Sequence, residues 1–376
     1  MRLFMFAGLA FLLIACDPQV ATQIPATDSI DSEAARLMAR EDVKGMALAV
    51  IENGDVAYVT AYGHRNVEQG LPLETYTVMY GASFTKTAFA YMVLQLVDEQ
   101  RFDLDRPLAE YLSKPIPDYE FYADLASDDR WQRLTARNVL THSTGFANFR
   151  WLEEDRKLRF HYAPGERYGY SGEGFYLLQF ALEEGLGLDV GTEMQTRIFD
   201  RFGMTKTSMQ WRPDFANNLA DGYGIDGSFE PHDVRDNVSA AGSMDTTIGD
   251  QAKMWAGILR GVGLSEESRA ELVRPQLDIR SAHQFPTLVE SSDERAQEIG
   301  LSAGLGLVTF GTGEDKAWFK GGHNDWTGNI VVCQEAMRRC VVLLANSVRA
   351  EIIYPEIVDF ILGDSDMPWW WEYQYE

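Results

Sequence analysis

A serine and a lysine three residues apart open a long apolar segment of this chain. In Ser83-Phe84-Thr85-Lys86, a helix beginning at Ser83 would place the serine hydroxyl and the lysine amine on one face. Burial disfavours a charged ammonium, so a buried Lys86 would have a lowered pKa and could accept the serine proton. Unpaired N–H groups at the helix start could stabilise an oxyanion beside Ser83. The alternative is a helix cap followed by an exposed lysine.

The surrounding segments predict the elements that must position this pair. Residues 83–100 contain no glycine or proline and are apolar nearly all round between Ala88 and Val97, which predicts a buried helix. Residues 46–51 and 56–59 flank Asn53-Gly54 and predict a hairpin. Residues 102–219 are typical of mainly helical structure. Further strands are predicted at residues 305–310, 317–320, 329–333 and 340–344, and further helices at residues 246–260 and 351–362.

Strand patterns from both ends of the chain thus flank a helical stretch. This order predicts an α/β (α+β) fold, in which an antiparallel sheet flanked by helices carries an inserted, mainly helical lobe. The predicted domain covers residues 32–364, with the sheet subdomain at 32–82 and 300–364 and the lobe at about 83–299. An aromatic C-terminal tail follows at residues 365–376.

Five segments in order resemble the motifs of one family. They are SFTK at 83–86, LTARNVLTHSTGF at 134–146, PGERYGYSGEGFYLL at 164–178, AAGSMDTTIGD at 240–250 and KGG at 320–322. Over about residues 32–362 the chain resembles the serine β-lactamase-related family, in particular its branch of class C β-lactamases, D-alanyl-D-alanine carboxypeptidases and serine esterases. The resemblance implies a β-lactamase/transpeptidase-like fold and an acyl-enzyme mechanism that needs no cofactor.

The resemblance also implies a role for each matching residue. Ser83 falls on the nucleophile, Tyr170 on the catalytic tyrosine and Lys320 on the lysine of the K-T-G triad. Lys86 and Tyr170 would share the general-base work. Lys320 would help lower the pKa of Tyr170 and would receive a substrate anion. The backbone N–H groups of Ser83 and His323, which follows Gly321 and Gly322, would form the oxyanion hole.

Two positions depart from the family pattern. Gly172 stands where the family has an asparagine that helps hold the lysine and the substrate amide, and Gly321 where it has a threonine that binds the substrate carboxylate. Each loss removes a hydrogen bond that contributes about 0.5–1.5 kcal/mol. We therefore expect esterase or D-peptidase-like activity rather than efficient β-lactam hydrolysis. The imidazole of His323 could replace some of the lost polar contact.

The other histidines and a run of three tryptophans are also conspicuous, and the resemblance gives them no chemical role. His142 lies in the segment THSTG, and the resemblance implies that it supports the fold. The six histidines lack metal-ligand spacing, so we expect no metal. Trp369, Trp370 and Trp371 could contact carbohydrate or membrane, or could pack on the domain; the sequence does not decide between these.

Two of the three cysteines lie symmetrically about a predicted hairpin. Cys333 and Cys340 flank the polar residues 334–339, and opposed residues of an antiparallel pair are within disulfide range. They could form a disulfide in an oxidising compartment, or remain as two free thiols on a buried strand.

The first residues are typical of an export signal. One basic residue, Arg2, precedes an apolar run that is too short to span a bilayer permanently. The run ends in Leu13-Ile14-Ala15-Cys16, which resembles a bacterial lipobox, so we predict a signal peptide at residues 1–15 and lipidation of Cys16. Residues 16–31 would form a flexible tether. The predicted location is the periplasmic face of the bacterial cell envelope, with lipid as the membrane contact.

Composition narrows the classes of function. The 376 residues include 33 Lys and Arg against 57 Asp and Glu, a net charge of −24, which disfavours binding to a phosphate backbone. With 45% apolar residues the chain is too hydrophobic to be disordered. We predict a monomeric serine hydrolase acting on a small-molecule or peptide substrate. The rival is a catalytically silent lipoprotein that binds peptidoglycan fragments or a protein partner in the same cleft.

Overall fold

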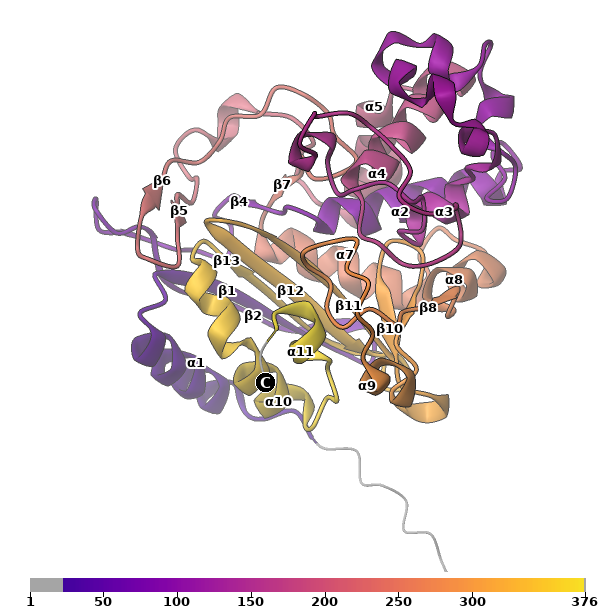
Figure 1. Ribbon diagram of the computed structural model, residues 1–376. Coiled ribbons are helices and arrows are strands. Elements are labelled where there is room, and N and C mark those ends of the chain that lie inside the picture. The colour runs from indigo at the N-terminus through magenta and orange to yellow at the C-terminus, as the bar shows by residue number, and fades with distance from the viewer. Residues whose placement is uncertain (1–22, 375–376) are drawn as a thin grey trace, which may run out of the picture.

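One large sheet organises the protein. The computed structural model describes residues 23–374 and contains a nine-stranded antiparallel sheet (Figure 1). Its order is β3-β2-β1-β13-β12-β11-β10-β9-β8, so the two ends of the chain meet where β1 pairs with β13. The strands are β1 Gly45–Glu52, β2 Asp55–Asn66, β3 Leu71–Pro72, β8 Leu277–Asp278, β9 Ser302–Ala303, β10 Val308–Phe310, β11 Ala317–Asn324, β12 Thr327–Gln334 and β13 Arg339–Ala345. The prediction of an antiparallel sheet drawn from both ends of the chain is confirmed.

Both faces of this sheet are covered, which explains why its central strands are apolar throughout. Along β1, Met46, Leu48 and Val50 pack into one core, and the alternate residues pack into the other. The first core lies under helices α1 Thr27–Glu41, α10 Tyr354–Leu362 and α11 Trp369–Glu372 (Figure 1). The second lies under α2 Phe84–Asp98, α7 Ile248–Arg260 and α8 Glu266–Val273.

The helical lobe sits above one end of the sheet (Figure 1). Its α-helices are short: α3 Ala136–Leu140, α4 Gly172–Phe180, α5 Val190–Met194 and α6 Asp200–Phe202, joined by 3-10 and π-helical turns. Two small sheets lie outside the main sheet, one of β4 Met79–Tyr80 with β7 Asp245–Thr246 and one of β5 Gly222–Tyr223 with β6 Phe229–Glu230. Helix α9, Glu294–Glu298, precedes β9.

The structure corrects several predicted boundaries. Helix α1 begins at Thr27, so residues 27–31 of the predicted tether are helical. The lobe does not extend to residue 299, because α7 packs on β1 and β2 and β8 is an edge strand of the main sheet. The predicted C-terminal tail is not separate either, since Trp371 in α11 is fully buried. The predicted signal peptide, Cys16 and residues 16–22 lie outside the described residues.

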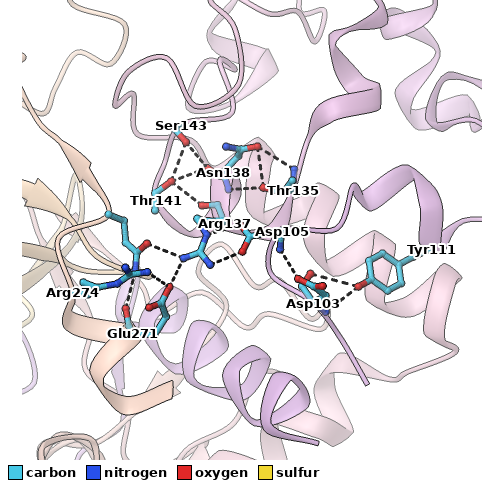
Figure 2. A network of polar contacts seen from close by, with 11 residues as sticks. Asp103, Asp105, Tyr111, Thr135, Arg137, Asn138, Thr141, Ser143, Glu271 and Arg274 are labelled. Atoms are coloured by element: carbon cyan, nitrogen blue, oxygen red, sulfur yellow. Dashed lines mark hydrogen bonds and ion pairs between the residues drawn. The ribbon is translucent and has the colours of Figure 1, made fainter. Parts of the chain in front are cut away.

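A polar network fixes the segment that carries His142. Arg137 in α3 donates to Asp105 at 2.6 and 2.7 Å, to Gln276 at 2.8 Å and to Glu271. Thr141 donates to the Arg137 carbonyl oxygen at 2.7 Å, and the Thr141 hydroxyl lies 2.9 Å from that of Ser143. Figure 2 shows Arg137 at the centre of these contacts. The turn at His142 is thereby anchored to residues from distant parts of the chain.

A disulfide closes the last hairpin. Cys333 in β12 and Cys340 in β13 are directly opposed, with their Cα atoms 4.1 Å apart, and are bonded. Of the two alternatives that the sequence left open, the structure has the disulfide. Across residues 23–374, none of the helices is both long and apolar enough to cross a bilayer.

Candidate active site

The start of α2 brings Ser83 and Lys86 together. Ser83 is the residue before the first helical turn, and the Lys86 amine lies 3.1 Å from its Oγ. Lys86 also donates to the Ala241 carbonyl oxygen at 2.5 Å and is only 1% exposed. Because α2 is apolar all round, it is buried on every side and carries the lysine with it. Burial, with the nearby charge of Lys320, holds the pKa of Lys86 well below its usual value, which favours the neutral amine.

Tyr170 completes a triad around the serine. It lies just before α4, and its hydroxyl donates to Ser83 Oγ at 2.7 Å. Burial raises the pKa of Tyr170, and the hydrogen bond with Ser83 only partly opposes this effect. Burial therefore dominates the net pKa of Tyr170, and the smaller contribution expected from Lys320, 3.4 Å away, stays a prediction. Tyr170 is a neutral phenol at ordinary pH, which leaves Lys86 as the better base.

His142 supports Tyr170 and makes no contact with Ser83. The two rings are stacked, with centroids 4.1 Å apart and planes 25° apart. Its Nδ1 accepts a hydrogen bond at 3.1 Å from the backbone of Ser171, which caps the start of α4. Burial and two nearby lysines hold the pKa of His142 well below its usual value. A neutral, buried ring of this kind fits the structural role predicted for it.

Strand β11 forms the opposite wall of the site. The Lys320 amine donates to the Gly321 carbonyl oxygen at 2.7 Å and to the Tyr170 hydroxyl at 3.4 Å. Burial lowers the pKa of Lys320 to about 8, against the opposing charge of Glu372. A Cβ on Gly322 would lie 3.1 Å from the Ser83 amide nitrogen, so glycine lets the strand approach the start of α2 closely. This approach places His323 next to the helix N-terminus.

His323 has a carboxylate partner. Its Nδ1 lies 3.2 Å from Glu351 Oε1. Burial alone would lower the pKa of His323, but the hydrogen bond and charge of Glu351, together with Glu372, raise it. His323 therefore stays a cation to a higher pH than an ordinary histidine, and in that form it adds a second positive charge near Lys320.

These groups face one open cleft with a volume of about 350 Å³. The structure brings Ser83, Lys86, Tyr170, Lys320, Gly321, Gly322 and His323 together along its walls, as predicted. Aromatic side chains form much of the remaining wall: Tyr80, Phe149, Trp151, Tyr176 and Phe285. Such a cleft suits an apolar acyl or aryl group next to the nucleophile.

Two of the wall residues explain the departures from the family pattern. A Cβ on Gly172 would collide with the ring of Phe149, which stacks on Trp151 with centroids 4.0 Å apart. A Cβ on Gly321 would collide with the carboxylate of Glu372. Both glycines are therefore required by side chains from elsewhere in the chain. Gly172 itself lies behind Phe149 and does not supply a cleft surface.

The sequence motifs do not include four residues of the site, namely Phe149, Gln284, Glu351 and Glu372. These residues follow or lie outside the segments that resemble the family motifs, so no motif pointed to them. The only signal was indirect, namely two glycines at positions where the family has a polar side chain. Within residues 23–374, no cluster of three or more His, Cys, Asp or Glu residues could hold a metal ion.

The arrangement can perform acyl transfer. A nucleophilic oxygen lies within hydrogen-bond distance of a neutral amine and a phenol, and a helix N-terminus lies beside it. The amine can accept the serine proton, the phenol can donate a proton, and backbone N–H groups can stabilise an oxyanion.

Several known proteins are similar to this chain in sequence or in fold. The teichoic acid D-alanine hydrolase of Staphylococcus aureus is 20% identical over 259 residues, which cover 64% of this chain and 58% of that protein. The chain thus spans less than two thirds of the length of this relative. A D-alanine carboxypeptidase from Burkholderia cenocepacia superposes with a TM-score of 0.69 at 19% identity, covering 89% of this chain and 98% of that chain. A class C β-lactamase superposes with a TM-score of 0.69 at 17% identity, covering 89% and 95%.

The superpositions confirm the predicted β-lactamase/transpeptidase-like fold. The family model described as Beta-lactamase matches residues 30–352, which is most of the chain. The chain therefore belongs to the Beta-lactamase family of serine hydrolases.

Proposed function

We propose that this protein is an esterase or D-peptidase-like hydrolase that forms an acyl-enzyme on Ser83. The observation that carries the proposal is the position of Ser83 Oγ, 3.1 Å from the Lys86 amine and 2.7 Å from the Tyr170 hydroxyl. A serine with a neutral amine on one side and a phenol on the other has both a proton acceptor and a proton donor.

In the acylation step, Ser83 Oγ attacks the substrate carbonyl carbon while Lys86 accepts the serine proton. The backbone N–H groups of Ser83 and His323 stabilise the resulting oxyanion. When the bond to the leaving group breaks, Tyr170 donates its proton to the leaving oxygen or nitrogen. The proton held by Lys86 then replaces the one that Tyr170 lost, so both groups return to their starting forms.

Deacylation uses the same residues. Water attacks the acyl carbon and gives a proton to Lys86, and Lys86 passes this proton to the Ser83 oxygen as that oxygen leaves. Lys320 lies 3.4 Å from the Tyr170 hydroxyl, where its positive charge favours any negative charge that develops on the phenol oxygen.

The walls of the cleft suggest which acyl groups are accepted. Phe149 covers Gly172, so an apolar ring takes the place of an amide-binding side chain. A site with fewer hydrogen-bonding groups discriminates less strongly among substrates. We expect turnover of activated short-chain esters such as p-nitrophenyl acetate, and weak or no turnover of cephalosporins.

A D-alanyl ester or peptide is the second candidate substrate. Two similar proteins support this candidate, since one is a teichoic acid D-alanine hydrolase and the other a D-alanine carboxypeptidase. Intact-mass detection of the acyl-enzyme over a panel of short esters, D-alanyl esters, D-Ala-D-Ala peptides and β-lactams separates these candidates.

A fluorophosphonate probe tests the proposal as a whole. Labelling of the folded wild-type protein that Ser83→Ala abolishes is the expected result. Absence of labelling would favour the rival function, a catalytically silent binding protein that uses the same cleft.

That the protein is a monomer remains a prediction, which light scattering can test.

The anchoring of the protein is a separate proposal. The segment Leu13-Ile14-Ala15-Cys16 supports lipidation of Cys16 and a location at the periplasmic face of the envelope. Cys16→Ser should abolish the incorporation of labelled palmitate, and a chain starting at about residue 21 should retain activity. Palmitate that still appears on the Cys16→Ser variant would refute this assignment.

A further inference from the structure

The C-terminal segment places a carboxylate in the cleft. Helix α11 carries Glu372, which is 4% exposed and lines the same cleft as Ser83. The neighbouring Trp371 is fully buried, and its carbonyl oxygen accepts a hydrogen bond from the backbone of Gln284 at 2.9 Å. The Trp371 ring lies near those of Tyr168 and Phe319, with centroids 5.6 and 6.2 Å away. The segment is therefore held firmly at this position.

The carboxylate of Glu372 has a fixed orientation. The Tyr168 hydroxyl donates to Gln284 Oε1 at 3.1 Å, so the Gln284 amide must direct its NH₂ group the other way. That group donates to Glu372 Oε2. The other oxygen, Oε1, points at Gly321, where a side chain would collide with it.

Two cations lie on the strand that Glu372 faces. Lys320 and His323 flank the two glycines of β11 at the edge of the cleft. Burial raises the pKa of Glu372, and the charges of Lys320 and His323 oppose this effect. Two cations in a partly buried cleft would attract an anion from solution. Glu372 supplies that negative charge from within the protein.

We propose that Glu372 occupies the anion-binding position of the cleft and thereby selects against substrates that carry a carboxylate there. The inference deepens the proposed function, on which it rests, by naming the substrate class: esters or amides that are uncharged or cationic at this position. A substrate carboxylate would meet the like charge of Glu372, and this charge already acts on both Lys320 and His323. A neutral group meets neither penalty.

Matched esters test this selection. Phenyl acetate and 3-carboxyphenyl acetate differ by one carboxylate on the leaving group, and phenyl butyrate and monophenyl glutarate differ by one on the acyl group. We expect the wild type to prefer the neutral ester of at least one pair. Glu372→Gln keeps the shape and one acceptor for Gln284, and should raise the relative kcat/KM of the anionic ester in that pair at least tenfold. Glu356→Gln, the same change at an exposed glutamate outside the cleft, should leave the ratio unchanged.

A second measurement does not depend on turnover. Arylboronic acids bond to a serine nucleophile without a leaving group, so the affinities of phenylboronic acid and 3-carboxyphenylboronic acid report on the same selection. Glu372→Gln should strengthen binding of the carboxylated compound relative to the other, again at least tenfold.

The outcomes separate the two claims. Wild-type protein that neither turns over the neutral esters nor reacts with the fluorophosphonate would overturn the proposed function. Active wild-type protein whose selectivity is unchanged in folded Glu372→Gln, both in the ester pairs and in the boronic acid pair, would overturn the role of Glu372 alone.

Discussion

The ring of Phe149 fills the space beside Gly172 that a side chain at that position would need. The two residues are neighbours across the junction between a loop of the lobe and the first turn of α4, where Gly172 donates its amide hydrogen to Asn148 Oδ1 at 3.0 Å. The position of Phe149 in the cleft wall therefore depends on a glycine at residue 172, and the effect of a substitution at one residue should depend on the other.

This coupling predicts the behaviour of a double mutant. Gly172→Asn alone should lower the free energy of unfolding by about 1–3 kcal/mol, because the new side chain overlaps the Phe149 ring. In a Phe149→Ala background the same substitution should cost much less. Urea unfolding of the four variants measures the coupling. Equal costs of Gly172→Asn in both backgrounds would contradict the overlap.

The buried Lys86 predicts how stability depends on pH. Its folded-state pKa lies well below that of an unfolded lysine, so between the two values the unfolded chain binds more protons and stability rises with pH. The free energy of unfolding of the wild type should rise relative to Lys86→Met by up to about 1.4 kcal/mol per pH unit as the pH approaches about 10. Lys206→Met at an exposed lysine is the control. A difference that stays constant with pH would show that Lys86 is not desolvated.

Lys320 predicts the basic limb of the activity profile. Its pKa of about 8 means that its charge is present below this pH and is lost above it. If this charge stabilises the developing negative charge on Tyr170, kcat/KM for a neutral ester should fall above about pH 8. Lys320→Met should be about 10²-fold slower at neutral pH and should lack this limb. A variant that keeps the same basic limb would assign it to another group.

The sequence was sufficient for the longer strands of the sheet, for helix α2 and for four side chains that meet at Ser83, but the short strands β3, β8 and β9 were not predicted. Alternating or continuous apolar runs marked the strands, and Ser83, Lys86, Tyr170 and Lys320 lay in segments whose spacing and order resemble one family. The structure brings all four side chains into one cleft. These features are local, so a linear pattern can encode them.

The remaining features depend on contacts between distant segments. Glu372 reaches the cleft because Trp371 packs into the core, and nothing near residue 372 signals a partner 51 positions earlier at Gly321. The net pKa of Tyr170 could not be predicted for the same reason. The motif indicates that Lys320 is near, but the extent of burial, which raises this pKa, depends on the whole fold.

The disulfide predicts a moderate effect on stability. Cys333 and Cys340 close a loop with a sequence separation of 7, in a hairpin that strand pairing already holds together. Replacing both by alanine should lower the free energy of unfolding by at most about 2–3 kcal/mol without loss of activity. Mass spectrometry of the unreduced wild type should find no free thiol at either position. Two free thiols in protein purified from an oxidising compartment would contradict the disulfide.

The central claim is that Ser83 forms an acyl-enzyme with esters that carry no carboxylate. The most direct measurement is intact-mass spectrometry of the protein quenched during turnover of p-nitrophenyl acetate, followed by peptide mapping. We predict one acetyl group, on Ser83, with none on Ser83→Ala and a loss of at least about 10³-fold in kcat for that variant. Ester turnover that persists in Ser83→Ala, or an acetyl group that maps to another residue, would contradict the account.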